Sequence, residues 1–330
     1  MTVLQGGGHI AEVLDKRSGI SPLWVPPWRS VEPMGFDAVK DPAYGASSEA
    51  RLLAGIMGHN LCLDIFGGPS AEEEAAGLHP HGEASIAPYE IEATGASLAM
   101  RATLAAAGLR VERRISLEDR AVRVLESVEN LSATDRPVGW TEHVTLGPPF
   151  LERGVTEFRA SATRSKVFER DFGAADYLVS AAEFEWPLAP QRDGGTADLR
   201  RFTDRQVSGA YTAHLMDPAR EHAWFVAFAP TARLAFGYVW RRTDFPWMGI
   251  WEENHSRTAP PWNGETLTRG MEFGVSPFPE TRREMIDRGR LFGVPTYRWL
   301  PARARVAVEY WMVTAEADRV PEALEWPGRG

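Results

Sequence analysis

Histidines occur in two segments whose composition is suited to proton transfer. Residues 78–85 contain His79 and His81, with Pro80 and Gly82 beside them, and residues 139–150 place His143 between a tryptophan and a Gly-Pro-Pro turn. Imidazole changes its charge near neutral pH and can donate or accept a proton. Any one of these histidines alone is as readily explained as a hydrogen-bonded structural residue. Two such segments together indicate a candidate acid–base site.

A third segment, residues 270–279, holds one carboxylate among apolar residues and turn formers. In a strand, Met271 and Phe273 point to the face opposite Glu272, so they would pack in one layer and leave the carboxylate on the other side. A partly desolvated carboxylate there is a better base. With the two histidine segments it forms a set of acid, base and positioning donor that needs no metal.

The elements that must position these groups are strands. Apolar and polar residues alternate with a period of two, which predicts half-buried antiparallel strands. The pattern runs through residues 110–117 with a return strand from 122, through a hairpin of 224–228 and 234–240, and through 305–312. Helical patterns are short and cover only 47–55 and 279–288. We therefore expect one all-β domain over residues 1–330, built from two large packed sheets with few short helices.

Composition excludes several classes of partner. The net charge is −9 and there is no run of Lys or Arg, which argues against nucleic-acid binding. No segment approaches the roughly 20 apolar residues of a membrane span, so no membrane partner is expected. The first ten residues lack the pattern of a secretory signal, and the expected location is the cytoplasm.

Two residue types have a modest bearing on function. The single cysteine, Cys62, lies between leucines and is interpreted as a small buried apolar residue rather than a catalytic thiol. The 12 tryptophans are expected mostly in the core, although some aromatic faces could stack on sugar rings.

At the histidine and glutamate segments the chain resembles the galactose mutarotase-like family, which includes aldose 1-epimerases and hexose-phosphate epimerases. His81-Gly82 is similar to the family's early His-Gly motif, residues 140–151 to its second histidine after a strand, and Met271-Glu272-Phe273-Gly274 to its late glutamate. The order and spacing match over roughly residues 5–315. The resemblance implies an antiparallel β-supersandwich, a small-molecule sugar substrate, no cofactor and no metal. We expect a monomer or a homodimer.

The resemblance also implies a mechanism of anomer exchange. Glu272 would remove the proton of the anomeric hydroxyl, His143 would protonate the ring oxygen, and His81 would donate to a neighbouring hydroxyl. The ring then opens, the carbonyl rotates, and the ring closes on the opposite face. His79 is a further substrate-binding candidate, and Trp251 and Trp262 could form an aromatic wall, because both lie in loops between late strands.

One feature departs from the family pattern. The best-known epimerases carry a hydroxyl-binding arginine about two residues after the His-Gly motif, whereas this chain has Glu83-Ala84-Ser85 there. Arg241 and Arg242, at the end of the strand that contains Trp240, are candidate substitutes.

Two alternatives remain open. A sugar-binding protein without turnover is compatible with the missing arginine. A cupin-type metalloenzyme would use His79, His81, Glu83 and His143 as ligands. Ligands at positions 79, 81 and 83 would crowd one strand face, which disfavours the metalloenzyme.

Overall fold

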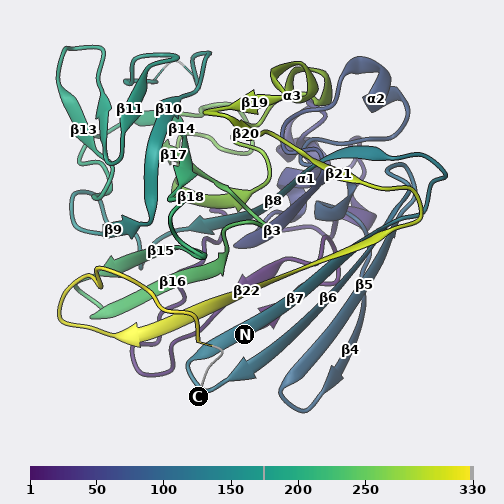
Figure 1. Cartoon of the computed structure of the whole chain (residues 1–330), viewed down its shortest axis with the longest axis horizontal. Coiled ribbons are helices and arrows are strands. Elements are labelled where there is room, and N and C mark those ends of the chain that lie inside the picture. The colour runs from purple at the N-terminus through teal and green to yellow at the C-terminus, as the bar shows by residue number, and fades with distance from the viewer. Residues whose placement is uncertain (174, 328–330) are drawn as a thin grey trace.

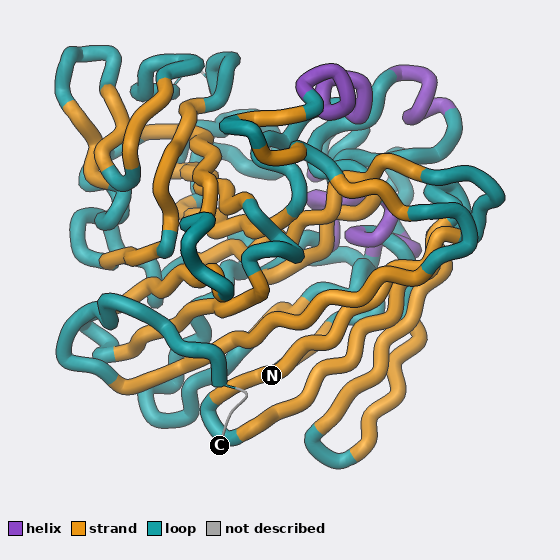
Figure 2. Tube along the Cα trace, viewed as in Figure 1, coloured by secondary structure: helices purple, strands orange, loops and turns teal. Residues whose placement is uncertain are grey.

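Two large antiparallel sheets packed face to face make up most of the molecule (Figures 1 and 2). The computed structural model describes residues 1–173 and 175–327. Within those residues, every ladder between named strands is antiparallel. This confirms the predicted all-β fold with its two antiparallel sheets.

The first sheet has ten strands and carries the histidine and glutamate segments. Its strands in spatial order are β1 (Thr2–Val3), β2 (Ile10–Glu12), β3 (His59–Asp64), β8 (Arg136–Leu146), β18 (Leu267–Gly274), β17 (Trp247–Asn254), β14 (Ser208–Met216), β10 (Ala162–Val167) and β11 (Glu183–Glu185), with β21 (Arg298–Leu300) also paired to β8.

The second sheet has eight strands and extends across the lower part of Figure 1, from β9, β15 and β16 at the left to β4 at the right. Its strands in spatial order are β4 (Glu90–Thr94), β5 (Ser97–Leu104), β6 (Leu109–Glu118), β7 (Ala121–Asn130), β22 (Arg305–Glu316), β16 (Leu234–Arg241), β15 (His222–Ala229) and β9 (Glu157–Ala160). Two short ribbons complete the strands: β12 (Leu188–Pro190) with β13 (Thr196–Asp198), and β19 (Arg290–Leu291) with β20 (Val294–Pro295).

The predicted strands match the observed ones closely. The alternation at 110–117 with its return strand is β6 and β7, the hairpin is β15 and β16, and the late strand is β22. Along β6, Val111 and Ile115 are buried between the sheets, whereas Arg110 and Arg114 are exposed. Period-two burial of one face thus sets the register of this sheet.

Helices are short and lie mainly at one end of the molecule (Figure 2). They are α1 (Ala50–Gly55), α2 (Ala71–Ala75) and α3 (Arg282–Arg288), with 3₁₀ turns η1 (Pro33–Gly35), η2 (Pro42–Tyr44) and η3 (Glu83–Ser85). The predicted helix at 47–55 begins three residues later, and the one at 279–288 begins at Arg282, because Thr281 caps it in a capping box with Glu284. Helix α2 was not predicted, although Ser70 and Glu73 form the same motif.

The outer face of the first sheet is covered by other parts of the chain along strands β14 and β17. Both strands are buried along their whole length rather than on alternate residues. An apolar layer that includes Leu52 and Leu53 of α1, Phe66, Trp251 and Trp262 covers this face. The layer encloses the site described below. Across the described residues, no helix has the length and hydropathy needed to cross a bilayer.

Candidate functional site

Strands β8 and β18 hold an imidazole and a carboxylate directly opposite each other. His143 and Glu272 are register partners in this antiparallel ladder, so their side chains leave the same face of the sheet. His143 Nε2 lies 2.9 Å from Glu272 Oε1, and the two side chains are 6% and 2% exposed. The neighbours of Glu272 in the chain, Met271 and Phe273, pack into the core between the sheets. This is the alternation that the sequence predicted for Glu272.

The remaining polar atoms of this pair differ in their contacts. His143 Nδ1 is 3.0 Å from Thr145 Oγ1, which fixes the ring plane. Glu272 Oε2 has no hydrogen-bond partner in the described part of the chain. Two glycines leave room for the carboxylate, because a Cβ on Gly270 would lie 2.5 Å from Oε1 and one on Gly249 would lie 3.3 Å from Oε2. Glu272 therefore keeps one oxygen on His143, and its Oε2 makes no geometric hydrogen bond although the Tyr211 hydroxyl lies near the carboxylate.

His81 lies beside His143, and its ring centroid is 5.2 Å from that of His143. Its backbone has a φ of 62°, and its N–H and C=O are bonded to Gly67 and Leu63. Burial, with smaller contributions from His143 and Arg257, lowers the pKa of His81 to about 3. His81 is therefore a neutral imidazole near neutral pH, suited to hydrogen bonding rather than to proton donation as an imidazolium.

The other ring nitrogen of His81 is held by the single cysteine. Cys62 Sγ lies 2.9 Å from His81 Nδ1. Burial raises the pKa of the Cys62 thiol, and the Asn60 amide donates to the same sulfur at 3.7 Å. A protonated thiol that already accepts from Asn60 can give its own hydrogen to His81 Nδ1. His81 then carries its proton on Nε2.

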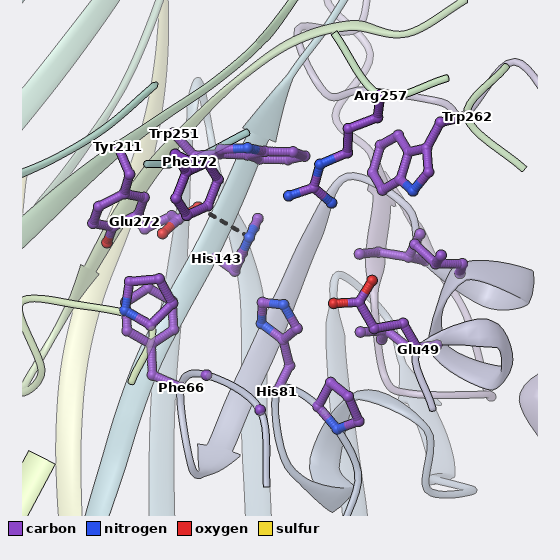
Figure 3. A pocket seen from close by; sticks show the side chains of 17 residues that line it. Glu49, Phe66, His81, His143, Phe172, Tyr211, Trp251, Arg257, Trp262 and Glu272 are labelled. Carbon is purple, nitrogen blue, oxygen red and sulfur yellow. Dashed lines mark ion pairs between the residues drawn. The ribbon is translucent and has the colours of Figure 1, made fainter. Parts of the chain in front are cut away.

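Glu272, His143 and His81 line one cavity of about 260 Å³. That volume lies just below the roughly 300–1,000 Å³ of pockets for drug-sized ligands, which suits one small molecule. Figure 3 shows the pair of Glu272 and His143 on one side and His81 below them. The remaining wall is largely apolar and aromatic, and it includes Leu52, Leu53, Ile56, Phe66, Phe172, Tyr211, Trp251 and Trp262. Trp262 lies in a loop as expected, whereas the expected loop position of Trp251 is wrong, because Trp251 lies within strand β17.

A cation that the sequence reasoning missed also faces the cavity. Arg257 lies in the loop after β17, with its guanidinium carbon 4.8 Å from the ring centroid of Trp262 and 5.4 Å from that of Trp251. The buried carboxylate of Glu253 holds this loop, since it accepts from the backbone N–H of Ser256 at 2.7 Å and of Arg257 at 3.0 Å. The sequence does contain a signal for this cation, because Arg257 stands between Trp251 and Trp262 and closely follows the strand that pairs with the Glu272 strand.

The structure does not bring every candidate into the cavity. His79 is half-buried and does not line it. Arg241 was expected as a substitute for the missing arginine, and this expectation is wrong, because β16 belongs to the other sheet and Arg241 lies exposed over Trp326. Arg242 follows β16 in the chain and also lies outside the cavity.

The four ligands of the cupin alternative do not converge either. The Glu83 carboxylate accepts from the backbone N–H groups of residues 105, 106 and 107, at 3.0, 2.9 and 3.1 Å. It therefore stabilises the β5–β6 turn. Across the described residues, no three His, Cys, Asp or Glu side chains are grouped as metal ligands would be.

Behind His143, on the inner face of β8, lies a buried cluster of charged groups. Glu142 Oε2 accepts from His59 at 2.8 Å, from Arg113 at 3.1 Å and from the Tyr310 hydroxyl at 3.0 Å. Arg113 also donates to Glu126 at 2.7 Å. Burial and the nearby Glu142 charge raise the pKa of Glu126 to about 8. The cluster ties β8 to β3, β6, β7 and β22, so it fixes the strand that carries His143.

Comparison with known proteins identifies the fold. No protein-family model matches the sequence, and no curated protein sequence does. A candidate aldose 1-epimerase from Klebsiella pneumoniae superposes with a TM-score of 0.67 at 12% identity, covering 95% of this chain and 76% of that one. A galactose mutarotase-like protein from Lactobacillus casei superposes with a TM-score of 0.57 at 12% identity, covering 95% and 96%.

An aldose epimerase homologue from C. elegans gives a TM-score of 0.56 at 11% identity, covering 96% of this chain and 95% of that one. At such low identity the shared feature is the course of the backbone, which extends over nearly the whole chain. This chain therefore has the galactose mutarotase-like fold that its histidine and glutamate segments predicted.

Proposed function

We propose that this protein interconverts the anomers of an aldose by acid–base opening and closing of the sugar ring. The observation that carries the proposal is the convergence of Glu272, His143 and His81 in one cavity. The galactose mutarotase-like fold supports it as an analogy of architecture. The aromatic rings of Trp251 and Trp262 in the wall are suited to the C–H faces of a sugar ring.

In this mechanism each group has its own role. The free Oε2 of Glu272 takes the proton of the anomeric hydroxyl. His143, as an imidazolium, gives the ring oxygen its Nε2 proton, which it shares with Glu272 Oε1 in the structure. The C1–O5 bond breaks, the carbonyl at C1 rotates, and the same groups work in reverse when the ring closes. Neutral His81 donates through Nε2 to a neighbouring oxygen. Proton transfer of this kind contributes about 10²–10⁴-fold to a rate.

The decisive experiment replaces the base. Glu272→Gln keeps the size of the side chain but cannot take up a proton. We expect the rate of anomer exchange to fall by about 10²–10⁴-fold while the sugar still binds, as measured by NMR magnetisation exchange over a panel of aldoses, sugar phosphates and sugar acids. Glu265→Gln is the matched control, because Glu265 is exposed and does not line the cavity.

Two outcomes would change the proposal. Full activity of Glu272→Gln would mean that another group is the base. A wild-type protein that binds sugars but exchanges none of them above the spontaneous rate would identify the protein as a non-catalytic sugar binder, the alternative left open by the sequence.

A further inference from the structure

One face of helix α1 forms a wall of the cavity. Glu49, Leu52, Leu53 and Ile56 all line it, at spacings of three, four and seven residues, which place them on one side of a helix. Glu49 is the N-cap residue of α1, and its side chain is the only charged group on this face. Figure 3 shows its carboxylate pointing into the cavity. Within the described residues, this carboxylate accepts no hydrogen bond and forms no ion pair.

Arg257 faces the same space from the opposite side (Figure 3). Its Nε lies 3.5 Å from Glu253 Oε2, and its ring contacts with Trp251 and Trp262 hold the guanidinium in place. The two terminal nitrogens have no side-chain or backbone acceptor in the described part of the chain. Glu49 and Arg257 therefore offer one acceptor and one donor to the cavity and do not pair with each other.

Glu49 and Arg257 both line the cavity, and no ion pair is drawn between them in Figure 3, so each can meet a ligand there. A hydroxyl group is the ligand that satisfies both sides, because it donates to a carboxylate and accepts from a guanidinium at the same time. We propose that Glu49 and Arg257 act together as a specificity element that binds a hydroxyl of a neutral sugar and rejects phosphorylated and acidic sugars. This inference rests on the proposed function and names the residues that select its substrate.

The position of Glu49 explains the rejection. Glu49 and Arg257 both line the cavity, whereas the charge of Glu272 is paired with His143, which the proposed mechanism uses as an imidazolium. A phosphate or carboxylate placed on Arg257 would also approach Glu49, where like charges repel. Rejection thus comes from Glu49, whereas Arg257 alone would attract an anion.

The test compares substrates across two variants. We measure kcat/KM for anomer exchange on neutral aldoses and on the matching 6-phosphates and uronic acids. The wild type should prefer the neutral sugar at least about tenfold. Glu49→Gln should reduce that preference, and Arg257→Met, which keeps apolar bulk between the tryptophans, should lower kcat/KM for neutral sugars by about tenfold to a hundredfold. Glu72→Gln on exposed α2 is the matched control.

Each remaining outcome is decisive. A wild type that prefers phosphorylated or acidic sugars, or an unchanged preference in Glu49→Gln, would overturn this inference and leave the acid–base proposal intact. If no sugar is exchanged, the proposed enzyme activity fails, and calorimetric binding of the same sugars then tests the specificity element. Selective binding of neutral sugars that weakens in both variants would support it, and equal binding of neutral and anionic sugars would refute it.

Discussion

At the scale of single residues, Cys62 has a role in the proposed mechanism that its sequence context does not indicate. The sequence predicts a small buried side chain, and Cys62 is indeed fully buried. Its sulfur is nevertheless 2.9 Å from His81 Nδ1, and Cys62 itself does not line the cavity. A hydrogen bond from the thiol selects the His81 tautomer that donates through Nε2. Cys62 is therefore a positioning residue in the proposed mechanism.

Replacing the cysteine tests this contact. Cys62→Ala should remove the tautomer preference of His81, which ¹⁵N NMR of the imidazole reports directly, and should lower kcat/KM about threefold to tenfold, as expected for one hydrogen bond. Cys62→Ser, which keeps a hydrogen donor, should restore most of both. A His81 tautomer that is unchanged in Cys62→Ala would contradict this role. A wild-type proton on Nδ1 would mean that Cys62 accepts from His81 and that Nε2 accepts from the substrate.

At the scale of elements, strand β8 links the site to the core. His143 leaves its outer face toward the cavity, and Glu142 leaves its inner face into the cluster with Arg113 and His59. Arg113 is 1% exposed and lies between two carboxylates, Glu142 and Glu126. Buried charges are stable only when paired, so this cluster is sensitive to the loss of one member. The same strand thus couples the position of His143 to the packing of both sheets.

Removal of the central cation should destabilise the whole sandwich. We expect Arg113→Met to lower the free energy of unfolding by about 3–5 kcal/mol, because two carboxylates would remain in the core without their guanidinium. Arg110→Met is the matched control on the same strand, since the Arg110–Glu129 pair is half-exposed and its loss should cost about 0–1 kcal/mol. Urea denaturation measures both, and similar values for the two variants would contradict the importance of the cluster.

At the scale of the whole molecule, buried neutral histidines link stability to pH. Burial lowers the pKa of His9 to about 4 and the pKa values of His81 and His214 to about 3, against about 6.5 in the unfolded chain. Between these values the unfolded state binds more protons than the folded state. The free energy of unfolding is therefore highest, as far as these histidines are concerned, above pH 6.5, and it decreases as the pH falls toward the folded pKa values. Glu126 acts in the opposite direction, because its raised pKa of about 8 favours the protonated folded form.

The histidines outnumber Glu126, so we expect the free energy of unfolding to decrease from pH 6.5 to pH 5. His214 lies away from the cavity, between Ser165 and Thr212. His214→Asn should flatten the pH dependence by about 1.4 kcal/mol per pH unit, which is the linkage of one proton. Urea unfolding at pH 6.5, 6.0, 5.5 and 5.0 measures this slope. An equal slope in the variant would show that His214 titrates alike in both states.

Local pattern in the sequence determined the class of fold and part of the site. Alternation with a period of two predicted β6, β7, β15, β16 and β22, because burial of one sheet face selects every second residue. The same alternation placed Glu272 opposite Met271 and Phe273. The Gly- and Pro-flanked histidines marked His81 and His143, since such residues occur where a strand ends and a side chain meets a ligand.

Only the tertiary structure decided which charges meet. Arg241 and Arg257 are both arginines near late strand ends, and the sequence analysis named Arg241 as a candidate but not Arg257. Strand order sends β16 into the second sheet and β17 into the first, so Arg257 reaches the cavity and Arg241 does not. Glu49 and Cys62 likewise acquire their roles from partners that are distant in the chain. Period-two alternation sets which face a side chain occupies, whereas strand pairing across the sheets sets its neighbours.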